Sequence, residues 1–158
     1  MTDPIQKTLH VPLRPQKAFE LFTENLDQWW PTESHSLSAA DGELPKQVKV
    51  DKHEGGHITE TKHDGDTGRW GTITKWDEGR AFGISWYVGR SEDEATDLEV
   101  LFIPTDMGTR IELTHSGFER LGNEAVAMHG NYLKGWEFVL TERFGQFCFR
   151  MKVDLSTA

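Results

Sequence analysis

The segment from His53 to His57 carries the residue types of a zinc site. Its two histidines are four residues apart and enclose Glu54. On a helix, this H-E-x-x-H spacing places both imidazoles on one face, where they bind zinc beside a glutamate that acts as general base. The remaining two positions are Gly55 and Gly56, and alternating apolar and polar residues flank the segment. We therefore interpret the motif as a hairpin turn and predict no metal site.

Two further features lack the partners that their chemistry requires. Asp64 to Gly68 begins like a calcium-binding loop, but Gly68 and Arg69 occupy the fifth and sixth positions, where a ligand and a glycine are needed. Cys148 is the single cysteine, it follows Phe147, and it is expected to be a small buried hydrophobe. The chain also has no glycine-rich phosphate loop, no G-x-S-x-G motif and no C-x-x-C motif. We predict no catalytic motif and no cofactor.

Three polar residues are notable for the phase at which they occur. His115 has the same strand parity as Ile111 and Leu113, so its side chain is expected to face inward. His129 and Tyr132 lie on or beside the apolar stripe of the last helix. Two interpretations stay open for all three: hydrogen-bonded core residues, or polar anchors or general acids inside a ligand pocket.

The composition is typical of one water-soluble globular domain, which we predict to span residues 1–158. The mean hydropathy is −0.59, and the apolar run Val100–Ile103 is far too short to cross a membrane. The chain begins with Met-Thr-Asp-Pro, without the pattern of a signal peptide. A single cysteine suits a reducing compartment, so the expected location is the cytoplasm.

The formal net charge of −9 argues against polyanionic partners. Proteins that bind nucleic acid use lysine and arginine to neutralise phosphates, so we expect neither nucleic acid nor an anionic membrane as a partner. The acidic stretch 91–97 is interpreted as a solvated loop. A weak homodimer formed through an exposed edge strand is left open.

Periodicity predicts the elements that would position the inward-facing residues. Proline at position 15 starts a helix whose apolar stripe includes Phe19, Phe22 and Trp29, and Pro31 ends it. The loop 32–44 follows, and we consider it as a lid. The alternation typical of strands occurs in seven segments: Ile5–Val11, Gln47–His53, His57–Lys62, Arg69–Trp76, Ala81–Val88, Asp97–Ile103 and Thr109–His115. Short turns between sequential strands predict an antiparallel meander.

A long amphipathic helix is predicted at the C-terminus, with Asn123 as its N-cap. Its apolar stripe includes Leu133, Trp136, Leu140, Phe144 and Phe147, and His129 extends it backwards. Because Gly130 and Gly135 each disfavour a helix by about 1 kcal/mol relative to alanine, a later start near Asn131 is the alternative. The expected fold is α+β, with an antiparallel sheet around this helix.

The order and spacing of these residues resemble a known family. Val11-Pro12, Trp29-Trp30-Pro31, Arg69-Trp70-Gly71, Ser85-Trp86 and the stretch from Gly108 to Phe118 are similar to signatures of proteins related to the activator of the ninety-kilodalton heat-shock-protein ATPase. That family belongs to the START-like, or SRPBCC, superfamily. The resemblance implies a helix-grip fold, in which a curved antiparallel sheet of six to seven strands closes over the C-terminal helix and often leaves an apolar cavity.

Fold alone does not decide between the activities found in such a superfamily. Our first hypothesis is a non-catalytic module that binds a hydrophobic or aromatic small molecule, such as a lipid or polyketide. Rings at inward phases would line the cavity, and His115 and His129 would orient the polar end of the ligand. The predicted cavity residues are Trp70, Phe82, Trp86, Phe102, His115, Phe118, His129, Tyr132 and Trp136.

Two alternatives come from the same resemblance. The first is a polyketide cyclase or dehydratase in which His115, His129 or Tyr132 acts as acid or base. The second is a module that binds a chaperone, which we consider the weaker alternative because the full activator carries a further N-terminal domain.

Overall fold

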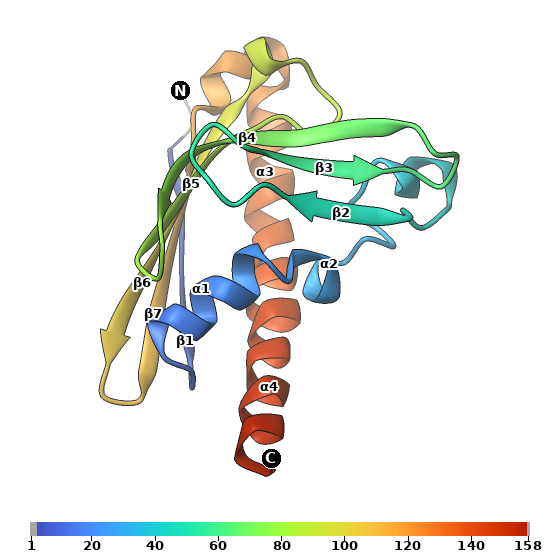
Figure 1. The fold of residues 1–158 in the computed structure, drawn as a ribbon. Coiled ribbons are helices and arrows are strands. Elements are labelled where there is room, and N and C mark those ends of the chain that lie inside the picture. Colours follow the sequence, from blue (N-terminus) through green and yellow to red (C-terminus); the bar gives the residue numbers. More distant parts are fainter. Residues whose placement is uncertain (1–2, 158) are drawn as a thin grey trace.

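A seven-stranded antiparallel sheet forms the framework of the computed structural model, which describes residues 3–157 (Figure 1). The strands are β1 (Ile5–Val11), β2 (Gln47–Val50), β3 (His57–Thr61), β4 (Thr67–Asp77), β5 (Ala81–Trp86), β6 (Thr96–Thr105) and β7 (Gly108–Ser116). Their order in the sheet is β1-β7-β6-β5-β4-β3-β2, so β1 and β2 form the two edges. The predicted meander is confirmed, and β1 closes it by pairing with β7.

The alternation read from the sequence separates the two faces of the sheet. In β6 the buried positions are Thr96, Leu98, Val100 and Phe102, and the residues between them are more exposed. In β7 every second residue from Thr109 to His115 is buried. Because side chains alternate across a strand, these buried residues all lie on the face of the sheet that packs against the helices. The predicted inward phase of His115 is therefore confirmed.

The segment expected to form one helix before Pro31 forms two. Helix α1 covers Pro15–Thr23 and helix α2 covers Leu26–Trp29, and Asn25 between them departs from helical geometry with φ −104° and ψ 25°. The Thr23 hydroxyl donates to the carbonyl of Phe19 at 2.8 Å, a bond that competes with the backbone at the end of α1. The break allows the ring of Trp29 to turn back and donate its N–H to the Leu21 carbonyl at 3.0 Å.

The C-terminal helix runs along the concave side of the sheet (Figure 1). It comprises α3 (Ala125–Trp136), a π-helical segment η4 (Glu137–Phe144) and α4 (Gly145–Thr157). A 3-10 segment, η3 (Phe118–Glu124), precedes it, so the N-cap is Glu124 rather than Asn123, and the alternative start near Asn131 is wrong. Gly117, at φ +85°, supplies the left-handed turn between β7 and η3.

One member of the predicted apolar stripe lies outside the core. Leu133 is 43% exposed, whereas Trp136, Leu140, Phe144 and Phe147 are buried as expected. At about 100° per residue, Leu133 lies about 60° to one side of Trp136, while Tyr132 lies about 40° to the other side. The buried face passes through Tyr132, so the helix exposes leucine and partly buries tyrosine.

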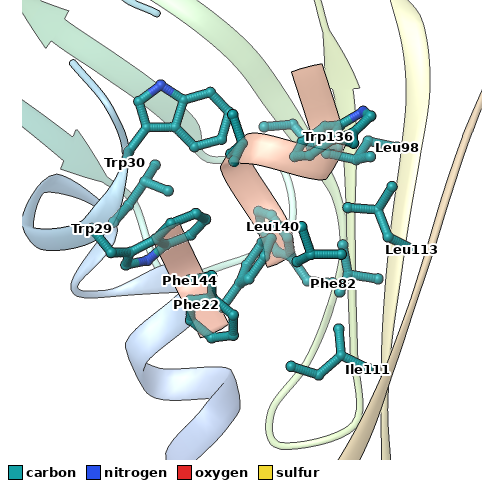
Figure 2. Close-up of a cluster of buried hydrophobic side chains, with 14 of the residues drawn as sticks. Phe22, Trp29, Trp30, Phe82, Leu98, Ile111, Leu113, Trp136, Leu140 and Phe144 are labelled. Atoms are coloured by element: carbon teal, nitrogen blue, oxygen red, sulfur yellow. The ribbon is translucent and has the colours of Figure 1, made fainter. Parts of the chain in front are cut away.

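Aromatic rings fill most of the space between sheet and helices. Phe22 contacts Trp29, Phe82, Phe102 and Phe144 at centroid distances of 5.1–6.3 Å. In Figure 2, Trp30 and Trp136 lie near one end of this cluster, and Phe22 and Ile111 lie further along. The space between Phe22, Phe82 and the neighbouring rings is only about 10 Å³, about the least that one water molecule requires.

The structure also bears on the zinc-like motif at His53–His57 and on membrane-spanning helices. His53–Gly56 lies in the turn between β2 and β3, which pair antiparallel, so the hairpin interpretation is confirmed. Among residues 3–157, no group of three or more histidine, cysteine or acidic side chains could hold a metal ion. No described helix is long and apolar enough to cross a membrane.

Candidate functional site

A cavity of about 190 Å³ lies where α3 passes into η4, beside the segment that follows α2. The helix contributes residues three or four positions apart, which therefore lie on one face. Trp30 and His35 form the opposite wall. The full lining is Trp30, His35, Met128, Asn131, Tyr132, Gly135, Trp136 and Val139. The walls are mostly apolar, which is the usual character of a small-molecule site.

Gly135 leaves part of this wall open. A Cβ atom built on Gly135 would meet nothing within 4 Å, so the position borders empty space. A glycine in a helix is less favourable than alanine by about 1 kcal/mol. The helix accepts that cost at the point where the cavity approaches its backbone.

Tyr132 is the polar group that faces the cavity from within the aromatic cluster. The indole N–H of Trp86 donates to the Tyr132 hydroxyl at 3.0 Å. Burial is the main reason why the pKa of Tyr132 is raised above its ordinary value, although the bond from Trp86 opposes this effect. The hydroxyl is therefore neutral and available as a hydrogen-bond donor at physiological pH.

His115 is fully buried below Trp136, and protein atoms occupy both of its ring nitrogens. The Trp136 indole can only donate, and it donates to Nδ1 at 3.0 Å. The hydrogen of the neutral ring is consequently on Nε2, which lies 2.7 Å from the Thr96 hydroxyl. That hydroxyl in turn donates to the Trp86 carbonyl at 3.4 Å. Burial lowers the pKa of His115 to about 3, so the ring stays neutral.

The structure brings six of the nine predicted cavity residues together. His115 contacts Phe118 and Tyr132 at 4.6 and 4.7 Å between ring centroids, and Phe118 contacts His129 at 5.3 Å. Only Tyr132 and Trp136 line the 190 Å³ cavity. The Nε2 of His129 lies 2.8 Å from the Asp3 carbonyl oxygen, at an exposed position.

The other three predicted residues also lie in the core, but they make no ring contact with His115 or Tyr132. Phe102 packs against Phe19 at 5.3 Å, and Phe82 packs against Trp76 at 5.9 Å, both beneath α1. Trp70 contacts Trp30 and Trp86 at 5.4 and 5.9 Å between ring centroids and donates its indole N–H to the buried Glu60 at 2.8 Å. These three rings pack the interior and do not line the cavity.

Glu60 anchors the segment that forms the outer wall of the cavity. Besides Trp70, its carboxylate accepts hydrogen bonds from the Leu37 amide at 2.7 Å and from the amide and hydroxyl of Ser38 at 2.9 and 2.8 Å. Burial opposes ionisation most strongly, but these donors together lower the pKa of Glu60 below its ordinary value. The buried carboxylate of Glu60 thus anchors the loop 32–44, which we considered as a lid, to β3.

Two more contacts hold this segment over the helix. The Trp30 indole donates to the His35 carbonyl at 2.7 Å, and Glu33 pairs with Arg143 of η4. The ring of His35 lies 6.0 Å from that of Phe138. Burial is the main cause that lowers the pKa of His35, so this ring is a neutral part of the wall near physiological pH.

A wider groove of about 660 Å³ lies at the far end of the sheet, away from the helix contacts described above. It is formed mainly by two loops, residues 12–15 and 104–108, and Met107 is 87% exposed. A molecule in this groove would stay in contact with water. The smaller cavity also opens to solvent, because His35 and Asn131 are exposed. Its wall is formed mainly by rings and contains no lysine, arginine, aspartate or glutamate, so we assign the site there.

The sequence predictions omitted most of the cavity wall. Trp30 belongs to the Trp-Trp-Pro run. A residue before proline favours extended backbone, and this signal could have indicated that the ring of Trp30 turns away from the helix. Gly135, in the middle of a helix, was a second signal. No pattern pointed to His35, whose position depends on the bonds to Glu60.

Comparison with known proteins identifies relatives of this fold. A family model described as "Activator of Hsp90 ATPase homolog 1-like protein" matches residues 12–146. No curated protein matches the chain significantly. Protein MLL2253 from Mesorhizobium loti has a similar structure, with a TM-score of 0.69 and 14% identity over 94% of this chain and 98% of that one.

Two other solved structures are informative. An AHSA1-like protein from Aeromonas hydrophila superposes with a TM-score of 0.65 at 15% identity, covering 95% of this chain and 94% of its own. An anthrahydroquino-gamma-pyrone synthase, Txn09, superposes with a TM-score of 0.62 at 26% identity, covering 92% and 96%. The helix-grip fold expected from the sequence is thus shared with these proteins.

Proposed function

The chain belongs to the Activator of Hsp90 ATPase homolog 1-like family, and within that family we propose that it binds a small aromatic or hydrophobic molecule between Trp30 and the C-terminal helix. The observation that carries this proposal is the 190 Å³ cavity with ring-lined walls. Side chains leave only about 10 Å³ empty in the neighbouring space among Phe22, Phe82 and Trp86. An apolar, ring-lined cavity beside a tightly packed interior is consistent with a binding site.

The volume limits the size of the ligand. A buried apolar cavity of about 150 Å³ in another protein holds benzene, so 190 Å³ suits a molecule of one or two rings. A ligand of about ten non-hydrogen atoms that gains roughly 0.5 kcal/mol per atom binds with about 5 kcal/mol, or a Kd of about 0.2 mM. Tighter binding requires a larger ligand and some opening of the wall.

Indanone, a neutral two-ring ketone, is a suitable first probe. Proton–nitrogen NMR spectra report each tryptophan through its indole N–H. We expect saturable shifts of the signals of Trp30, Trp86 and Trp136, which line or adjoin the cavity. Trp76 packs against Phe19 and Phe82 beneath α1 and serves as an internal control with little shift.

A matched pair of glycine variants tests the location. In Gly135→Leu the new side chain would occupy the cavity, and in Gly130→Leu it would enter open space outside the lining, on the same helix. We expect at least tenfold weaker indanone binding in Gly135→Leu and little change in Gly130→Leu. Equal binding by both variants would contradict the proposed site.

Catalysis on an aromatic polyketide is the second candidate function. The observation that favours it is the 26% identity with a structure described as an anthrahydroquino-gamma-pyrone synthase. Here Tyr132 is the candidate general acid, because its neutral hydroxyl borders the cavity, whereas both nitrogens of His115 are occupied. Turnover of a poly-β-ketone precursor, followed by mass spectrometry and lost in Tyr132→Phe, would support this function.

A further inference from the structure

We propose that the ligand presents a neutral carbonyl oxygen to the hydroxyl of Tyr132. This inference rests on the proposed function and narrows it from hydrophobic molecules in general to aromatic ketones, aldehydes and quinones. Tyr132 is partly buried, and its hydroxyl is a donor at the cavity whose hydrogen has no protein acceptor among the described residues.

The bond from Trp86 determines how Tyr132 uses its oxygen. An indole N–H donates only, so the Tyr132 oxygen is the acceptor of the 3.0 Å bond. The hydrogen of the hydroxyl must therefore point in another direction. A partly buried donor that has no protein acceptor gains a hydrogen bond when a ligand oxygen enters the cavity.

The other polar groups of the cavity wall either donate hydrogen bonds to protein atoms or lie at the exposed rim. The indole N–H of Trp30 donates to the His35 carbonyl, and that of Trp136 donates to His115. These two tryptophans thus present ring faces to the cavity. The side chains of Asn131 and His35 are exposed, and the Nδ1 of His35 lies 2.6 Å from the Ser34 hydroxyl. Tyr132 therefore provides the interior donor.

The lining also indicates the charge of the ligand. It contains no lysine, arginine, aspartate or glutamate. An ionised carboxylate in such a site would lose its hydration without gaining a counter-charge, which is strongly unfavourable. One hydroxyl donor in an apolar wall suits a neutral oxygen acceptor, and a carbonyl on a ring provides both the flat apolar surface and the acceptor.

Indanone and indane, which differ in one carbonyl group, test the inference directly. NMR titration of the unmodified protein is expected to give a Kd for indanone about fivefold lower than that for indane. In Tyr132→Phe the two Kd values are expected to become equal. Infrared difference spectra of bound indanone should show the carbonyl stretch at lower wavenumber in the unmodified protein than in Tyr132→Phe.

The outcomes separate this inference from the function on which it rests. If the unmodified protein binds both probes with equal affinity, the carbonyl preference is wrong and the hydrophobic site stands. If neither probe binds, both are wrong. Should Tyr132→Phe fail to fold, the infrared band in the unmodified protein still decides, because a carbonyl band unshifted from its position in hydrocarbon solvent would overturn the inference.

Discussion

At the scale of single residues, His115 shows how a polar side chain serves the core rather than the cavity. Trp136 and Thr96 occupy its two ring nitrogens, and no part of the side chain is exposed. The three side chains link β6, β7 and the C-terminal helix. Of the two interpretations that the sequence left open, a hydrogen-bonded core residue describes this geometry.

The neutral state of His115 predicts how stability depends on pH. The pKa is about 3 in the folded chain and 6.5 as the reference for the unfolded chain, so below pH 6.5 the unfolded state binds more protons. This contribution to stability is complete above pH 6.5 and is lost as the pH falls toward 3. Between pH 7 and pH 5 we expect a loss of about 2 kcal/mol from this residue.

Urea unfolding at pH 7, 6 and 5 measures this effect, with His115→Gln as the variant that does not titrate. Glutamine retains a donor and an acceptor, so it can replace part of the network. The unmodified protein should lose about 2 kcal/mol more than the variant over this range. Parallel loss in the two proteins would show that His115 does not carry the effect.

Cys148 leads to a second prediction at this scale. Its side chain is fully buried, and burial raises the pKa of the thiol to about 12. Because the thiolate is the reactive form, we expect Ellman's reagent to modify the folded protein at least a hundredfold more slowly than the urea-unfolded protein. Rapid modification under native conditions would reveal frequent opening of the C-terminal helix.

At the scale of elements, the segment between α2 and β2 depends on one buried carboxylate. Glu60 of β3 accepts two backbone amides, one hydroxyl and one indole. The 3-10 turn η1 (Ser38–Asp41) begins at this anchor. Because the same segment carries His35 into the cavity wall, Glu60 positions the wall without touching the cavity.

Glu60→Gln tests this anchor. An amide NH₂ would replace one acceptor oxygen and face backbone donors, so we expect a loss of about 1–3 kcal/mol in unfolding free energy. Hydrogen exchange at the Leu37 and Ser38 amides should be faster. Glu99→Gln, at an exposed position on β6, is the control and should change neither quantity.

The anchor also has a pH dependence of defined sign. The pKa of Glu60 is lowered in the folded chain, so its contribution is complete above the ordinary glutamate value. It is lost as the pH falls through the folded pKa. The protection of the Leu37 and Ser38 amides, relative to an unfolded chain at the same pH, should therefore remain high near pH 5, where the stability linked to His115 has already declined.

Local patterns predicted the elements well because each depends on neighbouring residues. The alternation of β6 and β7 and the Trp-Trp-Pro stop required only side-chain periodicity and proline geometry. The break at Asn25 and the exposure of Leu133 depended on tertiary packing, which favours Trp29 turning back and Tyr132 facing inward. The sequence pattern ranked leucine above tyrosine as a core residue, and packing reversed that order.

At the scale of the whole molecule, the curvature of the sheet decides which inward residues share a space. Phe82, Phe102 and Tyr132 all have inward phases, but Phe82 and Phe102 pack beneath α1 and Tyr132 lies at the other end of the core. Periodicity predicts which face of a strand or helix a residue lies on, but it does not predict where along the core that residue lies. The sequence therefore predicted six residues of one aromatic cluster but only two of the cavity wall.

Ligand binding should stabilise the molecule as a unit, because the cavity joins the helix to the segment anchored on β3. At a free indanone concentration ten times its Kd, binding to the folded state alone adds about 1.4 kcal/mol. For a chain of this size, that corresponds to a rise in Tm of about 3–6 °C. At the same indanone concentration the rise should be similar in Gly130→Leu and no more than about 1–2 °C in Gly135→Leu, and calorimetry measures all three. A rise in Gly135→Leu equal to that of the unmodified protein would place the ligand outside the cavity.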